Sequence, residues 1–336
     1  MRALIIGSGR MAAVRAGALR GASGHELVFA TRDRRRAVEL AREFDGSDVA
    51  LDRAALALVD AVFVTSATAF HQADIELALE AGVPVLVEKP LASSAEESAG
   101  LAAAAESAGV PVIVGFQRRF DVGFTRLKRA VDAGDVGRLY LMRSASMDHA
   151  PGTPAFIAQS AGIYRDLFVH DIDMAMWLTG RTVVAVYAVG DCRILDSYAE
   201  HGDADVATVL ATFDDGLTAT MHGIRHDPMG QDVRWELFGS TMAVATGLAR
   251  WTPLVAVDDP GATGLDPPMT FQARFADAFR SETLSFAESV CSDMPFLGCT
   301  AAEAAFVSVV AEACETSRRL GRRVAVVAPD PASKPR

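Results

Sequence analysis

The segment YRDLFVHDID, residues 164–173, places a histidine and several charged side chains within an apolar stretch. On a helix, Asp166 and His170 are one turn apart, and Asp173 follows on the same face. This spacing is compatible with a metal site, with an acid–base pair in which a carboxylate orients the imidazole, or with a solvated helix face. No second histidine has the spacing of a common metal motif, so we expect no bound metal. The local residues alone do not decide between the other two interpretations.

A lysine follows a buried strand in VPVLVEKPL, residues 83–91. Lys89 stands at the carboxyl end of that strand, and in an open α/β sheet this end faces the ligand crevice. Pro90 favours an extended Lys89, because the residue before a proline avoids the helical region. Lys89 could therefore hydrogen-bond a substrate hydroxyl oxygen, although a surface lysine at a strand end fits the pattern equally well.

A glycine turn, GSGRMA, directly follows the first apolar strand and opens a helix. Gly7 allows the tight turn, Gly9 leaves room for a pyrophosphate, and Ala12 permits close packing of helix and strand. The context favours a dinucleotide site over an ordinary glycine-rich turn. The residues that we expect to contact the cofactor are Gly7, Ser8, Gly9, Arg10, Met11, Thr31, Arg32, Ser66, His71, Glu88 and Lys89.

The end of the second strand, FATRDRRR, bears on the choice of dinucleotide. An NAD site usually has an acidic residue here, which accepts from the ribose 2′-hydroxyl. This chain has Thr31, followed by Arg32, whose guanidinium can pair with an additional phosphate. We therefore favour NADP. NAD remains the alternative, because a shift of two residues would make Asp33 the ribose ligand, and the arginines could form a solvated helix start.

The elements that position these residues predict two domains. In residues 1–118, short apolar strands, such as Glu26–Ala30, alternate with helical stretches, which indicates an α/β Rossmann domain with a doubly wound parallel sheet. In residues 119–328, successive strand-like segments predict an α+β domain whose largely antiparallel sheet is backed by helices and has one open face. The turn Asp214–Gly216 predicts a hairpin between two of these strands, and the segment Ala301–Leu320 predicts a late helix. Residues 329–336 are expected to form a loose tail.

Composition narrows the possible partners and location. The 336 residues carry a formal net charge of -11, which argues against nucleic-acid or acidic-membrane binding. The four cysteines form no CxxC pair, and the chain begins MRALIIGSGR without the features of a secretory signal. No uncharged apolar run reaches the length of a membrane span. We therefore expect a cytoplasmic protein.

Several ordered motifs together resemble the glucose–fructose oxidoreductase/inositol dehydrogenase/MocA (Gfo/Idh/MocA) family, and its inositol-dehydrogenase branch most of all. They are GSGRMA, the Glu88-Lys89-Pro90 turn, GFQRRFD, AGIYRDLFVHDIDMAMWLTG, RWELFGS and RFADAFRSETLSF. The resemblance implies that Lys89, Asp166 and His170 form the catalytic group. It also implies a homodimer or homotetramer, formed through the open sheet face of the second domain.

The chain departs from the inositol-dehydrogenase pattern around the expected substrate pocket. It has Ser160-Ala161-Gly162 where those enzymes read SGG, Met229 and Gln231 where they have tyrosines, and Met147-Asp148-His149 near an Arg-Asp-Pro turn. These changes predict a different pocket wall, so the polyol need not be myo-inositol. As weaker candidates for substrate contacts we name Asp148, His149, Asp173 and Arg225.

The function that these features predict is reversible hydride transfer between a nicotinamide and a secondary alcohol of a cyclic polyol or sugar. One alternative within the same class is a biosynthetic NADPH-dependent ketoreductase. An alternative of another class is a non-catalytic NADP-binding sensor or scaffold, which would not need to keep Lys89, Asp166 and His170.

Overall fold

A computed structural model of the chain describes residues 1–248, 251–254, 257, 267–292 and 294–327. The chain divides into two compact units. The first contains Met1–Phe120 and Asp277–Phe306, and the second contains Asp121–Ala276 and Val307–Ala328. The predicted tail, 329–336, lies outside the described residues.

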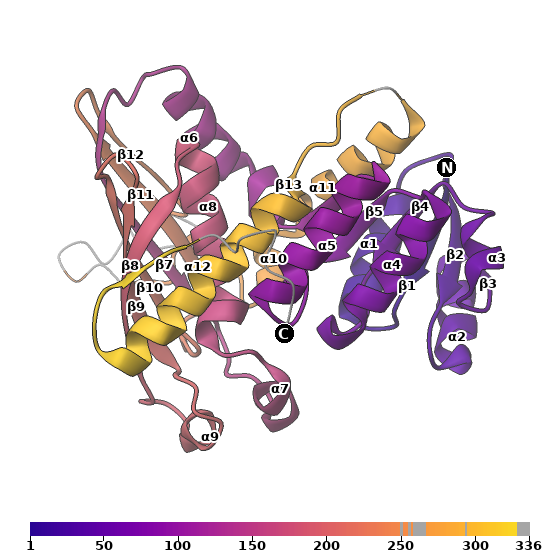
Figure 1. Cartoon of the computed structure of the whole chain (residues 1–336), viewed down its shortest axis with the longest axis horizontal. Coiled ribbons are helices and arrows are strands. Elements are labelled where there is room, and N and C mark those ends of the chain that lie inside the picture. The colour runs from indigo at the N-terminus through magenta and orange to yellow at the C-terminus, as the bar shows by residue number, and fades with distance from the viewer. Residues whose placement is uncertain (249–250, 255–256, 258–266, 293, 328–336) are drawn as a thin grey trace. The chain divides into compact units, whose positions relative to one another are not determined.

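The first unit is built on a mainly parallel sheet with the strand order β13-β6-β5-β4-β1-β2-β3. Among the described strands, only β13 runs antiparallel to its neighbour, β6. Helices line both faces of this sheet (Figure 1), which is why its central strand β4 is apolar and buried along its whole length. The strands are β1 (Arg2–Ile6), β2 (Glu26–Ala30), β3 (Ser47–Asp48), β4 (Ala61–Val64), β5 (Val85–Glu88), β6 (Val112–Gly115) and β13 (Cys299–Thr300). The helices are α1 (Arg10–Arg20), α2 (Arg34–Phe44), α3 (Arg53–Leu56), α4 (His71–Ala81), α5 (Ala95–Ala108) and α11 (Ala276–Cys291), with 3₁₀ turns η1 (Thr68–Phe70) and η2 (Gln117–Phe120).

Helix α11 comes from late in the chain, yet it packs onto the first sheet. Phe286 and Ala287 belong to the same buried core as β1 and β4. The Phe286 ring meets Phe63 edge-on, with centroids 5.3 Å apart. The compact units therefore differ from the contiguous division of the sequence analysis, because residues 277–306 are grouped with the first unit.

The second unit contains a mostly antiparallel sheet with the strand order β12-β11-β7-β10-β9-β8-β14. Strands β7 and β10 are parallel neighbours. A tight turn at Gly216, which has φ +88°, joins β9 to β10 as the sequence predicts. The strands are β7 (Leu139–Met147), β8 (Val183–Asp191), β9 (Val206–Phe213), β10 (Thr218–Ile224), β11 (Asp232–Gly239), β12 (Ala243–Thr246) and β14 (Val324–Ala325).

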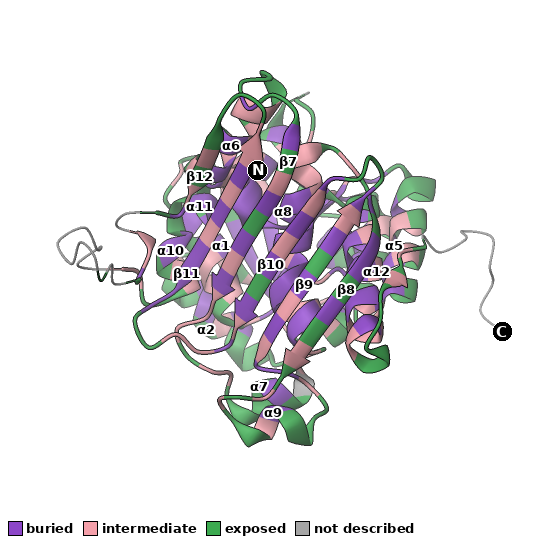
Figure 2. Ribbon diagram, turned by 90° about the vertical axis from the view of Figure 1, so that its left-hand side faces the viewer, coloured by how far each residue is buried: buried purple, intermediate pink, exposed green. Residues whose placement is uncertain are grey.

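Helices cover one face of the second sheet, and Figure 2 shows the other face with no helix in front of it. The helices outside the first group are α6 (Val122–Asp132), α7 (Pro154–Gln159), α8 (Val169–Thr179), α9 (Asp196–Glu200), α10 (Phe271–Arg274) and α12 (Ala301–Leu320), together with the π turn η3 (Tyr164–Phe168). Of these, α7 and α9 lie beyond the ends of the strands (Figure 2). The contact with η3 is close, because a Cβ at Gly223 of β10 would lie 2.6 Å from the Phe168 ring.

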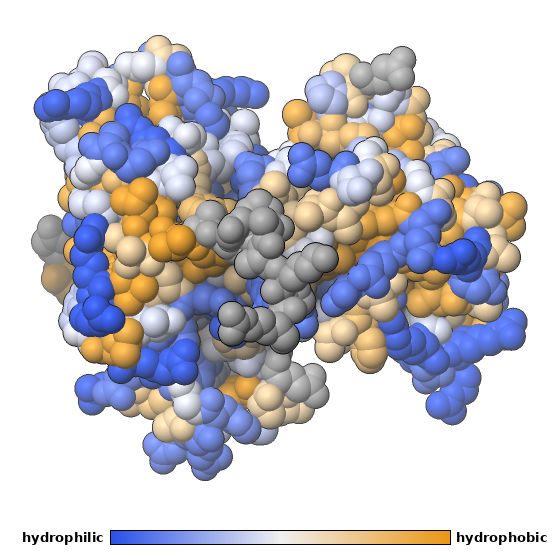
Figure 3. Space-filling model, viewed as in Figure 1, coloured by the Kyte–Doolittle hydropathy of each residue, from blue (hydrophilic) through white to orange (hydrophobic). Residues whose placement is uncertain are grey.

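The predicted fold class is confirmed in both units. Strand β2 and helix α12 have the predicted bounds. On the molecular face in Figure 3, hydrophilic side chains are interspersed with apolar ones. Within the part of the chain that the structure describes, no helix has both the length and the hydropathy required to cross a bilayer.

Candidate active site

The glycine turn between β1 and α1 has the geometry of an anion-binding loop. Gly7 has φ +123°, and a Cβ there would lie 2.6 Å from the carbonyl carbon of Thr65, so only glycine fits. Gly9 is the N-cap of α1 and makes no side-chain cap, and a Cβ at this position would meet no atom within 4 Å. An uncapped helix N-terminus beside open space suits a pyrophosphate. These residues therefore fit a dinucleotide.

The end of β2 presents an arginine that is held by a buried carboxylate. Arg32 contacts Asp74 through both terminal nitrogens, at 2.8 and 3.3 Å, and its guanidinium carbon lies 3.9 Å from the Phe70 ring centroid. Asp33 is the N-cap of α2 and accepts from the Arg35 backbone N–H at 3.1 Å. The Arg35 side chain, through its hydrogen bond, lowers the pKa of Asp33. The Thr31 hydroxyl donates to the Asp33 carbonyl oxygen.

Two predicted cofactor contacts at the ends of β4 and η1 are engaged within the chain. The Ser66 hydroxyl donates to Asp74 Oδ2 at 2.6 Å. His71 is buried, with Nδ1 3.0 Å from the Pro90 carbonyl oxygen and Nε2 3.0 Å from that of Ser66. Both ring nitrogens of His71 therefore face carbonyl oxygens of the protein, and the contact of His71 with the cofactor stays a prediction. Burial lowers the pKa of His71.

The Glu-Lys-Pro turn ends β5, as predicted. Glu88 Oε1 accepts from Arg15 Nε at 2.8 Å, and Lys89 is partly buried. The Lys89–Pro90 peptide bond is cis. The glycine turn, Thr31, Ser66 and Lys89 follow the parallel strands β1, β2, β4 and β5. They consequently share the carboxyl edge of the first sheet, which is the ligand-binding edge in folds of this kind.

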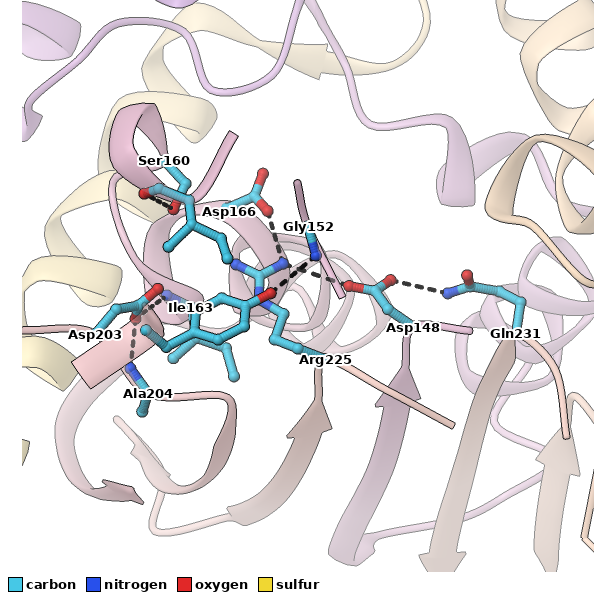
Figure 4. Close-up of polar contacts among 11 residues, drawn as sticks. Asp148, Gly152, Ser160, Ile163, Asp166, Asp203, Ala204, Arg225 and Gln231 are labelled. Carbon is cyan, nitrogen blue, oxygen red and sulfur yellow. Dashed lines mark hydrogen bonds and ion pairs between the residues drawn. The ribbon is translucent and has the colours of Figure 1, made fainter. Parts of the chain in front are cut away.

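The second unit brings Arg225, Asp148 and Asp166 together. Asp148 and Arg225 follow the parallel strands β7 and β10, whose last residues are in register. Arg225 Nη1 lies 2.7 Å from Asp166 Oδ2 and 3.3 Å from Asp148 Oδ2, and the guanidinium occupies the space between the two carboxylates (Figure 4). On the other side, Gln231 Nε2 donates to Asp148 Oδ1 at 3.2 Å.

Asp166 lies in the π turn η3, immediately before α8. The turn is fixed at its start, where the Ile163 N–H donates to Asp203 Oδ1 at 2.8 Å and the Tyr164 hydroxyl donates to the Val189 carbonyl oxygen at 2.9 Å. Short π turns within helices often occur at functional sites. His170 is the second residue of α8 and is partly buried. The predicted helix is confirmed, and the π turn within it was not predicted.

Charge and burial are strongly coupled around Arg225. Its side chain is only 4% exposed, and although burial by itself lowers the pKa of Arg225, the nearby Asp166 and Asp148 carboxylates raise it overall. Burial raises the pKa of Asp203, whose carboxylate accepts the Ile163 N–H. A permanently charged guanidinium therefore holds Asp166 in one position.

The weaker substrate candidates have different surroundings. Asp148 and Arg225 are joined by the ion pair, whereas His149 Nδ1 lies 3.3 Å from the Asp227 carbonyl oxygen. Asp173 has no exposed surface, and its contact with a substrate hydroxyl stays a prediction. Sequence reasoning missed the roles of Arg15 and Asp74. A signal existed for Arg15, since an arginine on the inner side of the α1 pattern requires buried partners.

Comparisons with known proteins agree with this arrangement. Residues 1–116 match the model of an oxidoreductase family with an NAD-binding Rossmann fold, and residues 124–245 match a Gfo/Idh/MocA C-terminal domain. A myo-inositol dehydrogenase from Streptomyces leeuwenhoekii is 36% identical, over 85% of this chain and 87% of that protein. A scyllo-inositol 2-dehydrogenase (NAD(+)) from Bacillus subtilis is 34% identical, over 69% of this chain and 68% of that protein.

Solved structures give the same result. A myo-inositol dehydrogenase from Corynebacterium glutamicum has a TM-score of 0.88 and 28% identity, covering 97% of this chain and 99% of that one. A scyllo-inositol dehydrogenase from Lactobacillus casei, solved with NAD(H) and scyllo-inositol, has a TM-score of 0.87 and 26% identity, with 97% and 99% coverage. The protein is an oxidoreductase with an NAD-binding Rossmann fold, and its chain forms two compact units. Its chain belongs to the Gfo/Idh/MocA family.

Proposed function

We propose that the protein catalyses reversible hydride transfer between a nicotinamide dinucleotide and a secondary alcohol of a cyclic polyol or sugar. The observation that carries this proposal is that the chain has all three residues that the family resemblance assigns to proton transfer. Lys89 ends β5 in the first unit, and Asp166 and His170 lie on η3 and α8 of the second. Inositol dehydrogenases that match most of the chain support a cyclitol as the substrate class.

In the proposed reaction, a bound nicotinamide supplies the hydride acceptor. His170 removes the hydroxyl proton as the alcohol is oxidised, and Lys89 hydrogen-bonds the substrate oxygen and stabilises its developing negative charge. Asp166 favours the protonated imidazole that results. Arg225 Nη1 lies 2.7 Å from Asp166 Oδ2 and holds this carboxylate in one position.

We further propose that NADP is preferred over NAD. No carboxylate stands at position 31, and the Asp33 carboxylate caps α2. A guanidinium has five N–H donors, and Asp74 engages only the two terminal nitrogens of Arg32, so donors remain for a 2′-phosphate. Against this stands the charge of Asp74, which partly neutralises Arg32.

The cofactor proposal is tested by comparing kcat/KM for the two dinucleotides in Arg32→Ala. We expect a loss of about ten-fold or more with NADP and a much smaller change with NAD. Arg34→Ala, which removes an exposed arginine of α2, is the control. An equal loss with both dinucleotides would reject the NADP assignment.

A ketoreductase working toward the alcohol is the second candidate, and the NADP-compatible end of β2 is the observation that favours it. We propose a reducing, cytoplasmic location, because none of the four cysteines, which all lie within the described residues, is in a disulfide. We also propose a homodimer or homotetramer formed through the open face of the second sheet. That face carries the exposed side chains of Tyr187, Val189 and Leu210, and large exposed apolar surfaces commonly mark interfaces.

The direct test of the catalytic assignment uses Lys89→Met and His170→Ala. Both variants should still bind reduced cofactor, as measured by nicotinamide fluorescence, and both should lose turnover by a few orders of magnitude. The substrates are a panel of inositols and sugars with each dinucleotide. Near-normal turnover in either variant would remove that residue from the mechanism.

A further inference from the structure

A buried ion cluster adjoins the Glu-Lys-Pro turn, and the mechanism above does not use it. Arg15, on α1, is completely buried. Its Nε donates to Glu88 Oε1 at 2.8 Å, and its Nη2 lies 2.8 Å from the same oxygen and 2.7 Å from Glu282 Oε2. Its Nη1 donates to Thr283 Oγ1 at 3.0 Å. All of these residues belong to the first unit.

The cluster requires an arginine. Burial by itself lowers the pKa of Arg15, but the Glu88 and Glu282 carboxylates raise it overall, so the guanidinium remains charged. The planar, forked guanidinium contacts Glu88 through Nε and Nη2, Glu282 through Nη2, and Thr283 through Nη1. We call this group the fork. A lysine has a single nitrogen and cannot span all three partners from the same position.

The Arg15 guanidinium has a close backbone neighbour. Gly115, at the end of β6, lies directly beside it. A Cβ at Gly115 would come within 2.9 Å of Arg15 Nη2 and 3.2 Å of Glu88 Oε2. The φ angle of Gly115 is outside the positive range that favours glycine, so the missing side chain makes room for the ion cluster.

We propose that Arg15 is a positioning residue for the reaction. It fixes the Glu88 carboxylate against α1 and α11, and because Lys89 is the next residue, it also fixes the backbone from which the Lys89 side chain extends. This inference rests on the proposed function, since it gives Lys89 a catalytic task. Small displacements of a catalytic group are costly, about 100-fold for an error near 1 Å.

Two variants disturb the fork in different ways. Arg15→Lys keeps the charge and removes the fork, and Gly115→Ala keeps every charged group and crowds the fork. In each we expect kcat to fall by about 10- to 100-fold, with a cofactor Kd within about three-fold of the wild type, since neither residue lies in the glycine turn. Arg20→Lys, on the exposed last turn of the same helix, is the matched control and should leave kcat unchanged.

A double-mutant cycle with Lys89→Met separates positioning from a general structural role. If Arg15 acts through Lys89, Arg15→Lys should change the residual kcat of Lys89→Met by less than about two-fold. The proposal is overturned if Arg15→Lys lowers kcat by the same factor in the Lys89→Met background as in the wild type. It is also overturned if kcat in Arg15→Lys alone is unchanged. Failure of the proposed function would look different, because Lys89→Met would then retain normal turnover.

Discussion

Arg225 lies between two carboxylates of the candidate site. In the structure, Arg225 binds Asp166 and Asp148 while its own side chain is 4% exposed. Its first role is therefore to hold the two carboxylates, and any contact with substrate would come through groups that this ion cluster has already fixed.

Arg225→Lys should accordingly lower kcat/KM by about 10- to 100-fold, because one ammonium cannot hold both carboxylates as the guanidinium does. Steady-state kinetics with the best cyclitol substrate will measure the effect. Arg193→Lys is the control, since Arg193 makes an exposed ion pair with Asp191 in the same unit. Wild-type kcat/KM in Arg225→Lys would show that the ion cluster is not needed for turnover.

His71 gives the protein a predictable dependence of stability on pH. Burial lowers the pKa of His71 in the folded state, so below about pH 6.5 the unfolded chain binds more protons at this position. The neutral His71 ring therefore contributes to the free energy of unfolding above about pH 6.5, and this contribution is lost as the pH falls below that value. His71→Gln should therefore show a smaller drop in Tm between pH 8 and pH 5 than the wild type. Equal drops would contradict this account, and His201→Gln, at an exposed position, is the control.

At the scale of elements, the β1–α1 turn is the feature whose geometry is most restrictive. Gly7→Ala would place a Cβ 2.6 Å from the Thr65 backbone at a φ of +123°, so the turn must move away from β4. We expect cofactor affinity to weaken by at least about ten-fold, as measured by fluorescence titration. Gly100→Ala, within α5 where a Cβ meets no atom within 4 Å, should keep affinity and slightly raise Tm. Unchanged affinity in Gly7→Ala would exclude the turn as the pyrophosphate site.

Local sequence patterns predicted some of the elements and not others. Apolar runs such as Glu26–Ala30 and the long periodic segment Ala301–Leu320 predicted β2 and α12 with their bounds, because burial and period set them locally. The parallel β7–β10 pair and the π turn η3 were not predictable, since both depend on contacts with distant segments. The same limit applies to the site. Residue types indicated Lys89, Asp166 and His170, but the Arg225–Asp166 pair joins positions 59 residues apart.

At the scale of the whole molecule, the open face of the second sheet carries the expectation of an oligomer. Leu210, which pairs in register with Tyr187 on β8, is 40% exposed on that face. Leu210→Asp should shift the protein toward monomer in light scattering coupled to size-exclusion chromatography, because a charge at an apolar interface loses its hydration. Leu58→Asp, at an exposed position of the first unit, should leave the mass unchanged. A monomeric wild-type protein would refute the assembly proposal.

Isotopic labelling shows whether a hydride passes from a cyclic polyol or sugar to the nicotinamide. The protein is incubated with oxidised dinucleotide and a cyclitol that carries deuterium on every ring carbon, and the reduced cofactor is examined by NMR. The account predicts deuterium at the nicotinamide C4, on one face only, and a slower initial rate than with the unlabelled compound. A reduced cofactor that carries hydrogen rather than deuterium at C4, or no reduction with any labelled inositol or sugar, would contradict it.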